Sequence, residues 1–259
     1  MDLTDFNLDF FSLQGKNAVV TGGNGGLGRA FSGALAKAGA NVLVPSLAED
    51  DGSTQDLVEG AGASYRFLAA DITAEGGCKR VVEACVETWG SIDILVNCAG
   101  ININVQDVTK FGRAEWDKMI AVNQTAAFEM IHEACPHMIA QKSGKIINIA
   151  SLFSFLGGRW SPAYAASKHG IVGLTKAMCD ELAEHNIQVN AIAPGYFATP
   201  LTEDTRNDTV RNAEILAHIP ANRWGWSADL MGATVFLASA ASNYVNGTVL
   251  TVDGGYLVR

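Results

Sequence analysis

Short, almost wholly apolar segments alternate with stretches of helical periodicity along this chain. The apolar segments predict seven strands, at residues 18–20, 42–44, 65–69, 94–96, 145–149, 188–192 and 248–252. Between them, apolar residues recur at three- and four-residue spacing over 27–35 and about 74–89, 114–140, 162–184 and 227–239, which predicts helices. Strands that alternate with helices form right-handed βαβ units, and strands this apolar are covered on both faces. We therefore expect an α/β fold: a Rossmann-type, doubly wound, parallel seven-stranded sheet with helices on both faces.

No feature of the sequence divides it into parts. The 259 residues contain no internal repeat, low-complexity stretch or linker, so we expect one domain over 1–259. One segment departs from the alternation: from about 201 to 218 the chain is polar, with a weak apolar stripe at Val210, Ala213, Ile215 and Leu216. We expect it to form a small helical lid over a site, with borders at about 196 and 220.

Composition excludes several classes of protein. With 48% hydrophobic and 17% charged residues the chain is not disordered, and a formal charge of −9 disfavours nucleic-acid binding. No apolar run approaches a membrane span, and the acidic stretch 1–11 does not resemble a secretory signal. The five cysteines are scattered, which favours reduced thiols and gives no metal site. We expect a cytoplasmic protein with no membrane or nucleic-acid partner.

The turn between the first predicted strand and the first predicted helix is rich in glycine. It reads Thr21-Gly22-Gly23-Asn24-Gly25-Gly26-Leu27-Gly28. Glycines at 22, 26 and 28 allow the backbone to turn tightly and to approach a pyrophosphate. The start of the helix offers that anion free N–H groups and a positive dipole end. The position between a strand and a helix supports a dinucleotide site.

This T-G-x-x-x-G-x-G spacing, with several later motifs in the same order, resembles the short-chain dehydrogenase/reductase family. Asn97-Cys98-Ala99-Gly100 is similar to its N-N-A-G turn, 164–168 is similar to its Y-x-x-x-K, and Pro194-Gly195 follows the sixth strand. The resemblance implies an NAD(P)-dependent alcohol dehydrogenase or ketoreductase. It implies cofactor contacts at Gly22, Asn24, Gly26, Leu27, Gly28, Ser46, Asp71, Ile72, Asn97, Ala99, Gly100, Tyr164, Lys168, Pro194, Gly195, Phe197 and Thr199.

Four residues are candidates for catalysis. Tyr164 and Lys168 are four apart in a predicted helix, so both side chains project from one face. A free phenol has a pKa of about 10, and a nearby ammonium and the cationic nicotinamide would lower it, so that the phenolate can act as a general base. By resemblance, Lys168 also holds the ribose hydroxyls, and Ser151 stabilises charge on the substrate oxygen. Asn123 resembles the family's asparagine that supports a water relay to the lysine.

The choice between NAD and NADP depends on the end of the second strand. An acid there binds the ribose hydroxyls, whereas a nearby arginine accepts the 2′-phosphate. Ser46 stands where the acid is expected, but no Lys or Arg lies between Lys37 and Arg66, and the acids at 49–51 would repel a phosphate if they point inward. Arg29 is a possible phosphate partner or a solvated helix residue. We expect NAD, with NADP not excluded.

The last third of the chain resembles a branch of the family that acts on sugar acids such as 2-dehydro-3-deoxy-D-gluconate and gluconate. The reaction implied is hydride transfer between NAD(P) and a secondary alcohol or ketone of the acid. That branch commonly has two arginines after N-N-A-G, but here 101–105 carries no charge. A sugar acid needs its carboxylate paired, and arginine does this best. Arg159 is the nearest remaining candidate, followed by Arg206 and Arg211 in the predicted lid.

The substrate pocket and the assembly complete the expectations. Substrate contacts are expected from Ser151, Phe153, Arg159, Tyr164 and Tyr196, with Trp160 and Phe197 as further candidate walls. Because the paired arginines are missing, an uncharged sugar, polyol or other ketone is the alternative substrate. A nucleotide-sensing protein without turnover is a third hypothesis. Members of the family commonly pair their long helices, so the resemblance implies a homotetramer.

Overall fold

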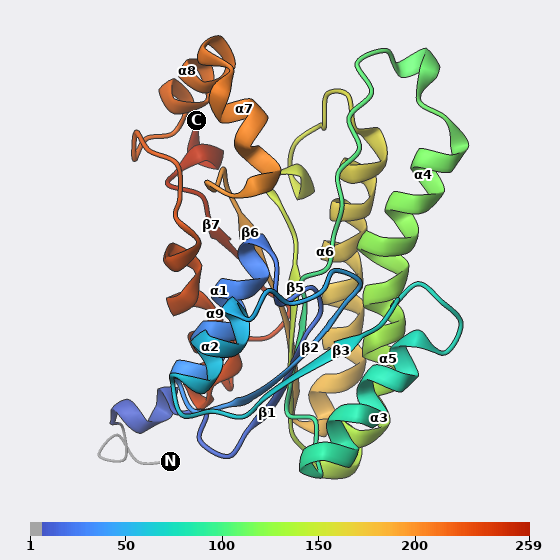
Figure 1. Ribbon diagram of the computed structural model, residues 1–259, viewed down its shortest axis with the longest axis vertical. Helices are drawn as coiled ribbons and strands as arrows, with labels where there is room; N and C mark the ends of the chain where they lie inside the picture. The colour runs from blue at the N-terminus through green and yellow to red at the C-terminus, as the bar shows by residue number, and fades with distance from the viewer. Residues whose placement is uncertain (1–6) are drawn as a thin grey trace.

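The computed structural model describes residues 7–259. All adjacent strands of its seven-stranded sheet are parallel, in the order β3-β2-β1-β4-β5-β6-β7 (Figure 1). The strands are β1 (Asn17–Val20), β2 (Asn41–Ser46), β3 (Tyr65–Ala69), β4 (Ile94–Asn97), β5 (Gly144–Ile149), β6 (Ile187–Pro194) and β7 (Val249–Val252). The strand order reverses between β1 and β4, which is where a doubly wound sheet binds its ligand. The expected fold class is confirmed.

Helices cover both faces of the sheet (Figure 1). One face carries α1 (Gly26–Lys37), α2 (Ser53–Glu59) and α9 (Met231–Ala238). The other carries α3 (Gly77–Trp89), α4 (Arg113–Ile120), α5 (Ala126–Gln141) and α6 (Pro162–Leu182). The short helices α7 (Glu203–Asn207) and α8 (Thr209–His218) lie beyond the carboxyl ends of the strands. Within residues 7–259, no helix combines the length and the apolar character needed to cross a membrane.

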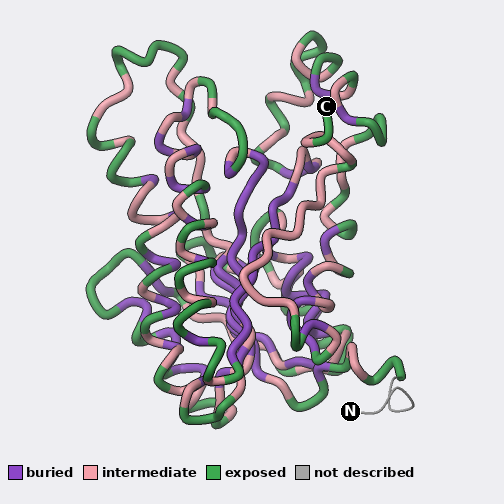
Figure 2. Tube along the Cα trace, turned by 180° about the vertical axis from the view of Figure 1, so that it is seen from behind, coloured by how far each residue is buried: buried purple, intermediate pink, exposed green. Residues whose placement is uncertain are grey.

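The core consists of two layers, one on each side of the sheet. Successive strand residues point to opposite faces, so Val19 joins the cluster beneath α3 and α5, whereas Ala18 and Val20 join the cluster beneath α1 and α9. The buried segments form the central column of Figure 2, between exposed outer helical faces. This packing holds the carboxyl ends of β1, β4 and β5 side by side, where the candidate residues lie.

Two helix predictions need correction. The helix expected over 114–140 is divided by a π-helical turn, η4 (Ala121–Thr125), which lies between α4 and α5. Such turns often occur at functional sites, and this one carries Asn123. The prediction also missed α2, because it has seven residues and buries only Thr54 and Val58, so its apolar periodicity is too short to recognise.

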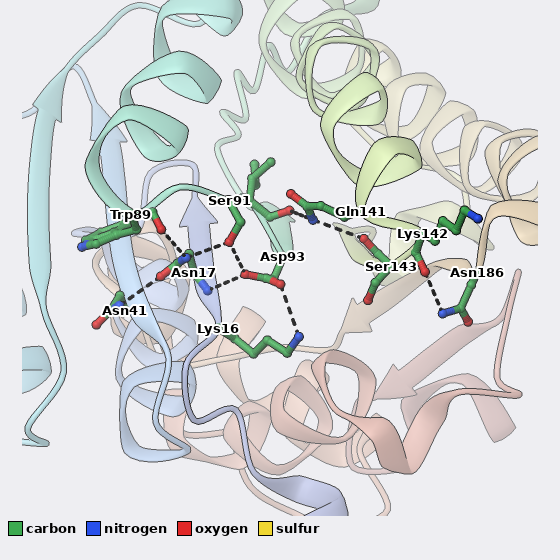
Figure 3. Close-up of polar contacts among 11 residues, drawn as sticks. Lys16, Asn17, Asn41, Trp89, Ser91, Asp93, Gln141, Lys142, Ser143 and Asn186 are labelled. Carbon is green, nitrogen blue, oxygen red and sulfur yellow. Dashed lines mark hydrogen bonds and ion pairs between the residues drawn. The ribbon is translucent and has the colours of Figure 1, made fainter.

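A polar network joins the amino ends of β1, β2 and β4, at the edge opposite the glycine-rich turn (Figure 3). One carboxylate, Asp93, accepts hydrogen bonds from Asn17 N at 3.0 Å, Ser91 Oγ at 2.8 Å and Lys16 Nζ at 3.3 Å. Asn17 in turn accepts a hydrogen bond from Asn41 Nδ2 at 3.0 Å. The hydrogen bonds made by Lys16, Asn17 and Asn41 thus join different strands of the sheet at this edge.

We expect Asp93→Ala to lower the free energy of unfolding by about 1–3 kcal/mol, because the donors on Asn17 and Ser91 lose a charged acceptor. Urea denaturation measures the change. Glu87→Ala removes an exposed acid on α3 and should stay within about 0.5 kcal/mol of the wild type. Equal stability of the two variants would contradict the assignment of a structural role to the network.

Candidate active site

The glycine-rich turn is joined directly to the turn after β4. Thr21 Oγ1 accepts hydrogen bonds from the backbone N–H groups of Cys98 and Ala99, both at 3.0 Å. Gly22 has φ +64°, and a Cβ placed on it would lie 3.3 Å from Ala99 Cα. A Cβ on Gly28 would lie only 2.1 Å from the Gly22 carbonyl oxygen. Close packing of the two turns therefore requires glycine at both positions.

The first turn of α1 is built to receive an anion. Its N-cap, Gly25, makes no side-chain hydrogen bond to the helix, so the first N–H groups are left for a ligand. Across from it lies Thr199, whose Cβ would be 3.9 Å from a Cβ on Gly26. Main-chain donors, a positive helix end and the Cβ and methyl group of Thr199 thus border one small space. These residues fit the pyrophosphate of a dinucleotide.

The end of β2 forms the edge of this space. Ser46 lies there, and Asn24 Nδ2 donates to the Ala48 carbonyl at 2.8 Å. The Arg29 side chain points back toward the glycine-rich turn, where its Nη2 donates to the Asn24 carbonyl at 3.0 Å. Its guanidinium therefore lies at the edge of the turn and is not fully solvated.

The acids that follow β2 are engaged by their own neighbours. Asp50 accepts a hydrogen bond from Tyr65 Oη at 2.5 Å. Asp51 accepts hydrogen bonds from Ser53, which hold the pKa of its carboxyl below the usual value, and it also pairs with Arg29 at 3.4 Å. Both carboxylates thus have local partners, which weakens the expectation that they would repel a ribose phosphate.

The remaining cofactor candidates surround the carboxyl ends of β3, β4 and β6. Asp71 accepts from Thr73 N at 2.8 Å and Thr73 Oγ1 at 2.6 Å, which fixes the turn that carries Ile72. Asn97 Nδ2 donates to Asn148 Oδ1 at 2.9 Å, inside the sheet. Pro194 and Gly195 end β6, and the Gly195 N–H donates to Val252 O at 2.8 Å. The ring of Phe197 is buried in the core, against Gly225.

Ser151 lies two residues after the end of β5 and caps a short 3₁₀ turn. Its Oγ accepts from Phe153 N at 3.2 Å, while Ser154 Oγ accepts from Ser151 N at 3.2 Å. The same Ser154 hydroxyl donates to the Lys168 carbonyl at 2.7 Å. Ser154 therefore joins the end of β5 to α6, which sets the position of Ser151 relative to Tyr164 and Lys168.

Tyr164 and Lys168 lie one turn apart at the start of α6. Lys168 Nζ is 5.6 Å from the centre of the Tyr164 ring and donates to the Ile149 carbonyl at 2.7 Å. The Tyr164 ring packs edge-on against Phe153, with ring centres 5.9 Å apart. Phenol, ammonium and the Ser151 hydroxyl therefore come together from two elements.

Burial sets the ionisation of both groups. It raises the pKa of Tyr164, an effect that a hydrogen bond to Ser151 opposes, and it lowers the pKa of Lys168 to about 8. Without a cofactor the phenol is therefore protonated at neutral pH. A cation beside it favours the phenolate, and the ammonium of Lys168 is the one that the chain supplies.

Asn123 connects the turn after β4 with α6. Its Oδ1 accepts from Ile101 N at 2.8 Å, and its Nδ2 donates to Ile101 O at 2.9 Å and Ser167 Oγ at 3.3 Å. A Cβ on Gly100 would lie 3.4 Å from Asn123 Oδ1 and 3.8 Å from Lys168 Nζ. The π-helical turn thus brings the asparagine next to the lysine, and its amide holds the backbone at the edge of the site.

The substrate candidates divide into two groups. Phe153 lies against Tyr164, next to the reacting groups. Tyr196 instead packs with Trp224 and Tyr256, with ring centres 5.5 and 5.2 Å away, in an aromatic cluster beside the C-terminus. Arg159 is exposed and its guanidinium lies 5.0 Å from the centre of the Trp160 ring.

Two site features were missed from the sequence. Cys98 interacts electrostatically with Lys168, and burial raises the pKa of its thiol to about 12. Ser154 forms the link between β5 and α6, and its place three residues after Ser151 could have suggested a capping box. Arg206, a candidate for the substrate carboxylate, instead donates to the Thr199 carbonyl at 3.1 Å.

Comparison with known proteins gives consistent relatives. The oxidoreductase YgcW of Escherichia coli (strain K12) is 61% identical over 257 residues, which cover 99% of this chain and 98% of that protein. The 2-dehydro-3-deoxy-D-gluconate 5-dehydrogenase of the same strain is 47% identical over 253 residues, covering 97% and 99%. The crystal structure of a gluconate 5-dehydrogenase from Burkholderia cenocepacia J2315, in complex with NADP and tartrate, has a TM-score of 0.92 and 36% identity, covering 97% and 99%.

The family assignment follows from the same comparison. Residues 16–210 match the short chain dehydrogenase family, a range that runs from β1 through the tyrosine and lysine of α6 into α8. The expected resemblance is therefore confirmed. This chain belongs to the short chain dehydrogenase family.

Proposed function

We propose that this protein is an NAD(P)-dependent oxidoreductase that interconverts a secondary alcohol and a ketone on a sugar acid. The observation that carries the proposal is the convergence of Ser151, Tyr164 and Lys168 beside the glycine-rich turn. Substrate class is supported by relatives named for it, which act on 2-dehydro-3-deoxy-D-gluconate and gluconate.

In this mechanism Tyr164 moves the proton. During oxidation the alcohol O–H proton passes to the Tyr164 phenolate as the C–H bond breaks and the C=O bond forms; during reduction the phenol returns it. Ser151 donates a hydrogen bond to the substrate oxygen and stabilises the charge that develops there. Lys168 favours the phenolate by its charge. The nicotinamide, when bound, supplies the hydride acceptor or donor.

At the glycine-rich turn and the start of α1, the residues proposed to hold the cofactor are Gly22, Asn24, Gly26, Leu27 and Gly28, and Thr199 lies across from them. The lack of any Lys or Arg between Lys37 and Arg66 supports NAD. Three observations support NADP as well. Arg29 lies beside Asn24, and both Asp50 and Asp51 have local partners. The Burkholderia relative binds NADP. Comparing kcat/KM for NAD⁺ and NADP⁺ at saturating substrate decides between them.

The experiment that tests the substrate class measures reduction of the nicotinamide by purified protein. We compare kcat/KM for 2-dehydro-3-deoxy-D-gluconate, D-gluconate and an uncharged polyol, because this ratio reports differential stabilisation of the transition state. A preference for either acid supports the proposal. Turnover of the polyol alone would favour the alternative substrate class, an uncharged sugar, polyol or ketone. Cofactor binding without turnover of any alcohol would favour a nucleotide sensor.

We further propose a homotetramer in the cytoplasm. Large apolar side chains are exposed on α4 and α5, at Trp116 and Phe128, and near the C-terminus, at Tyr244 and Val258, and a second copy of the chain could cover them. The five cysteines are unpaired, as in a reducing compartment. Light scattering should give four times the mass of one chain.

A further inference from the structure

The segment before α6 is fixed to the turn that follows β4. Val105 N donates to the Trp160 carbonyl at 2.8 Å, and Ser161 Oγ donates to Asn102 Oδ1 at 2.6 Å. Trp160 itself has φ +69°, a conformation that a bulky residue rarely adopts. These contacts therefore fix the backbone at Trp160 next to the uncharged stretch 101–105.

Two guanidinium groups from distant parts of the chain meet on this indole. The Cζ of Arg159, the residue before Trp160, is 5.0 Å from the ring centre. The Cζ of Arg211, in the first turn of α8, is 5.1 Å from the same centre. Guanidinium groups stack on aromatic faces, which limits their motion without using their hydrogen-bond donors.

Neither arginine forms an ion pair with another described residue. The nearby acid Asp208 is used by the backbone, since its carboxylate accepts from Val210 N and Arg211 N, both at 3.1 Å. In a chain of net charge −9, two like charges thus contact the same indole, and neither forms an ion pair with a described carboxylate.

This pair lies on the same side of the fold as the reacting groups. Trp160 precedes the first turn of α6 and stands four residues before Tyr164, while Arg211 lies in the first turn of α8. Helix α8 lies beyond the carboxyl ends of the strands, as the candidate site does (Figure 1). The arginines and the reacting groups thus belong to the same end of the fold.

From these contacts we infer that Arg211, together with Arg159 and stacked on Trp160, binds the carboxylate of the substrate. The two arginines take the place of those that are absent from 101–105. Arg211 comes from α8, and Arg159 comes from the segment before α6. The inference rests on the proposed function and deepens it, because it assigns the acid specificity to named side chains. Arginine forms charge-assisted, often bidentate hydrogen bonds with a carboxylate, and an uncharged polyol offers no such partner.

The test compares two substrates in two arginine variants and a control. We expect Arg211→Gln and Arg159→Gln to lower kcat/KM for the sugar acid by about 10- to 100-fold, while kcat/KM for an uncharged polyol stays within about twofold. The double variant should lose less than the product of the two single effects, because both side chains bind one group. Lys79→Gln removes an exposed charge on α3, far from α8, and should change neither value.

A binding measurement separates failure of this inference from failure of the proposed function. Calorimetric titration of D-gluconate into the enzyme with bound reduced cofactor gives a Kd that needs no turnover. Suppose that the wild type binds the acid and that the variants bind it at least tenfold more weakly, but that no acid is turned over. In that case the inference stands and the proposed function fails. Equal losses for acid and polyol, an unchanged Kd in the variants, or no binding of the acid to the wild type would overturn the inference.

Discussion

Tyr164→Phe should lower kcat/KM for alcohol oxidation by about 10²–10⁴-fold, the usual contribution of a positioned general base. The substitution removes only the phenolic oxygen. The ring that packs against Phe153 remains, so the fold and the approach of Lys168 to the ring should remain as well. Steady-state kinetics in both directions, at saturating cofactor, measure the loss.

The pH dependence gives this prediction a second readout. Because burial raises the pKa of Tyr164, the phenol is protonated near neutrality, and oxidation by the wild type should rise with pH while reduction falls. Above about pH 8, Lys168 loses its charge in the cofactor-free protein. Binding of the anionic cofactor favours the ammonium form of Lys168, so it should extend the pH range of activity to higher values. The residual activity of the Phe variant should show neither trend. Full activity of Tyr164→Phe would rule out the proposed base.

The parts of the fold that the sequence predicted are those with strong local patterns. Seven apolar strands between helices leave few arrangements other than a doubly wound sheet, because parallel strands require crossovers of one hand. Helix α2 and the π-helical turn at 121–125 were missed because neither carries a distinct apolar period. The turn matters for the site, since it aims the Asn123 amide at Ile101.

The candidate site was predictable where residues act through short spacing. Tyr164 and Lys168 share one helix face, and the glycines share one turn, so the geometry is contained in segments of five and eight residues. The stacking of Arg159 and Arg211 on Trp160 was not predictable, because it depends on where α8 packs after β6. The direction of Arg206, toward Thr199, depends on the same packing.

Gly28→Ala should weaken binding of the reduced cofactor by about 10- to 100-fold, corresponding to the 1–3 kcal/mol that overpacking typically costs. The new Cβ would lie 2.1 Å from the Gly22 carbonyl oxygen, so that carbonyl has to move. It accepts a hydrogen bond from Gly25 N at 3.2 Å, and Gly22 N donates to Pro45 O at 2.9 Å, so its movement distorts the whole turn. Fluorescence titration with NADH and NADPH measures the Kd.

Gly25→Ala is the matched control within the same turn. Gly25 has φ −104°, which alanine adopts without strain, and its Cβ would meet only the Gly22 oxygen, at an ordinary 3.8 Å. The Kd of this variant for the cofactor should therefore stay close to the wild-type value, although Gly25 and Gly28 are only three residues apart and each variant adds one methyl group. If Gly28→Ala instead bound cofactor as tightly as the wild type, the start of α1 would not be the pyrophosphate site. If the two variants lost affinity equally, the effect would come from reduced glycine flexibility and not from the contact with Gly22.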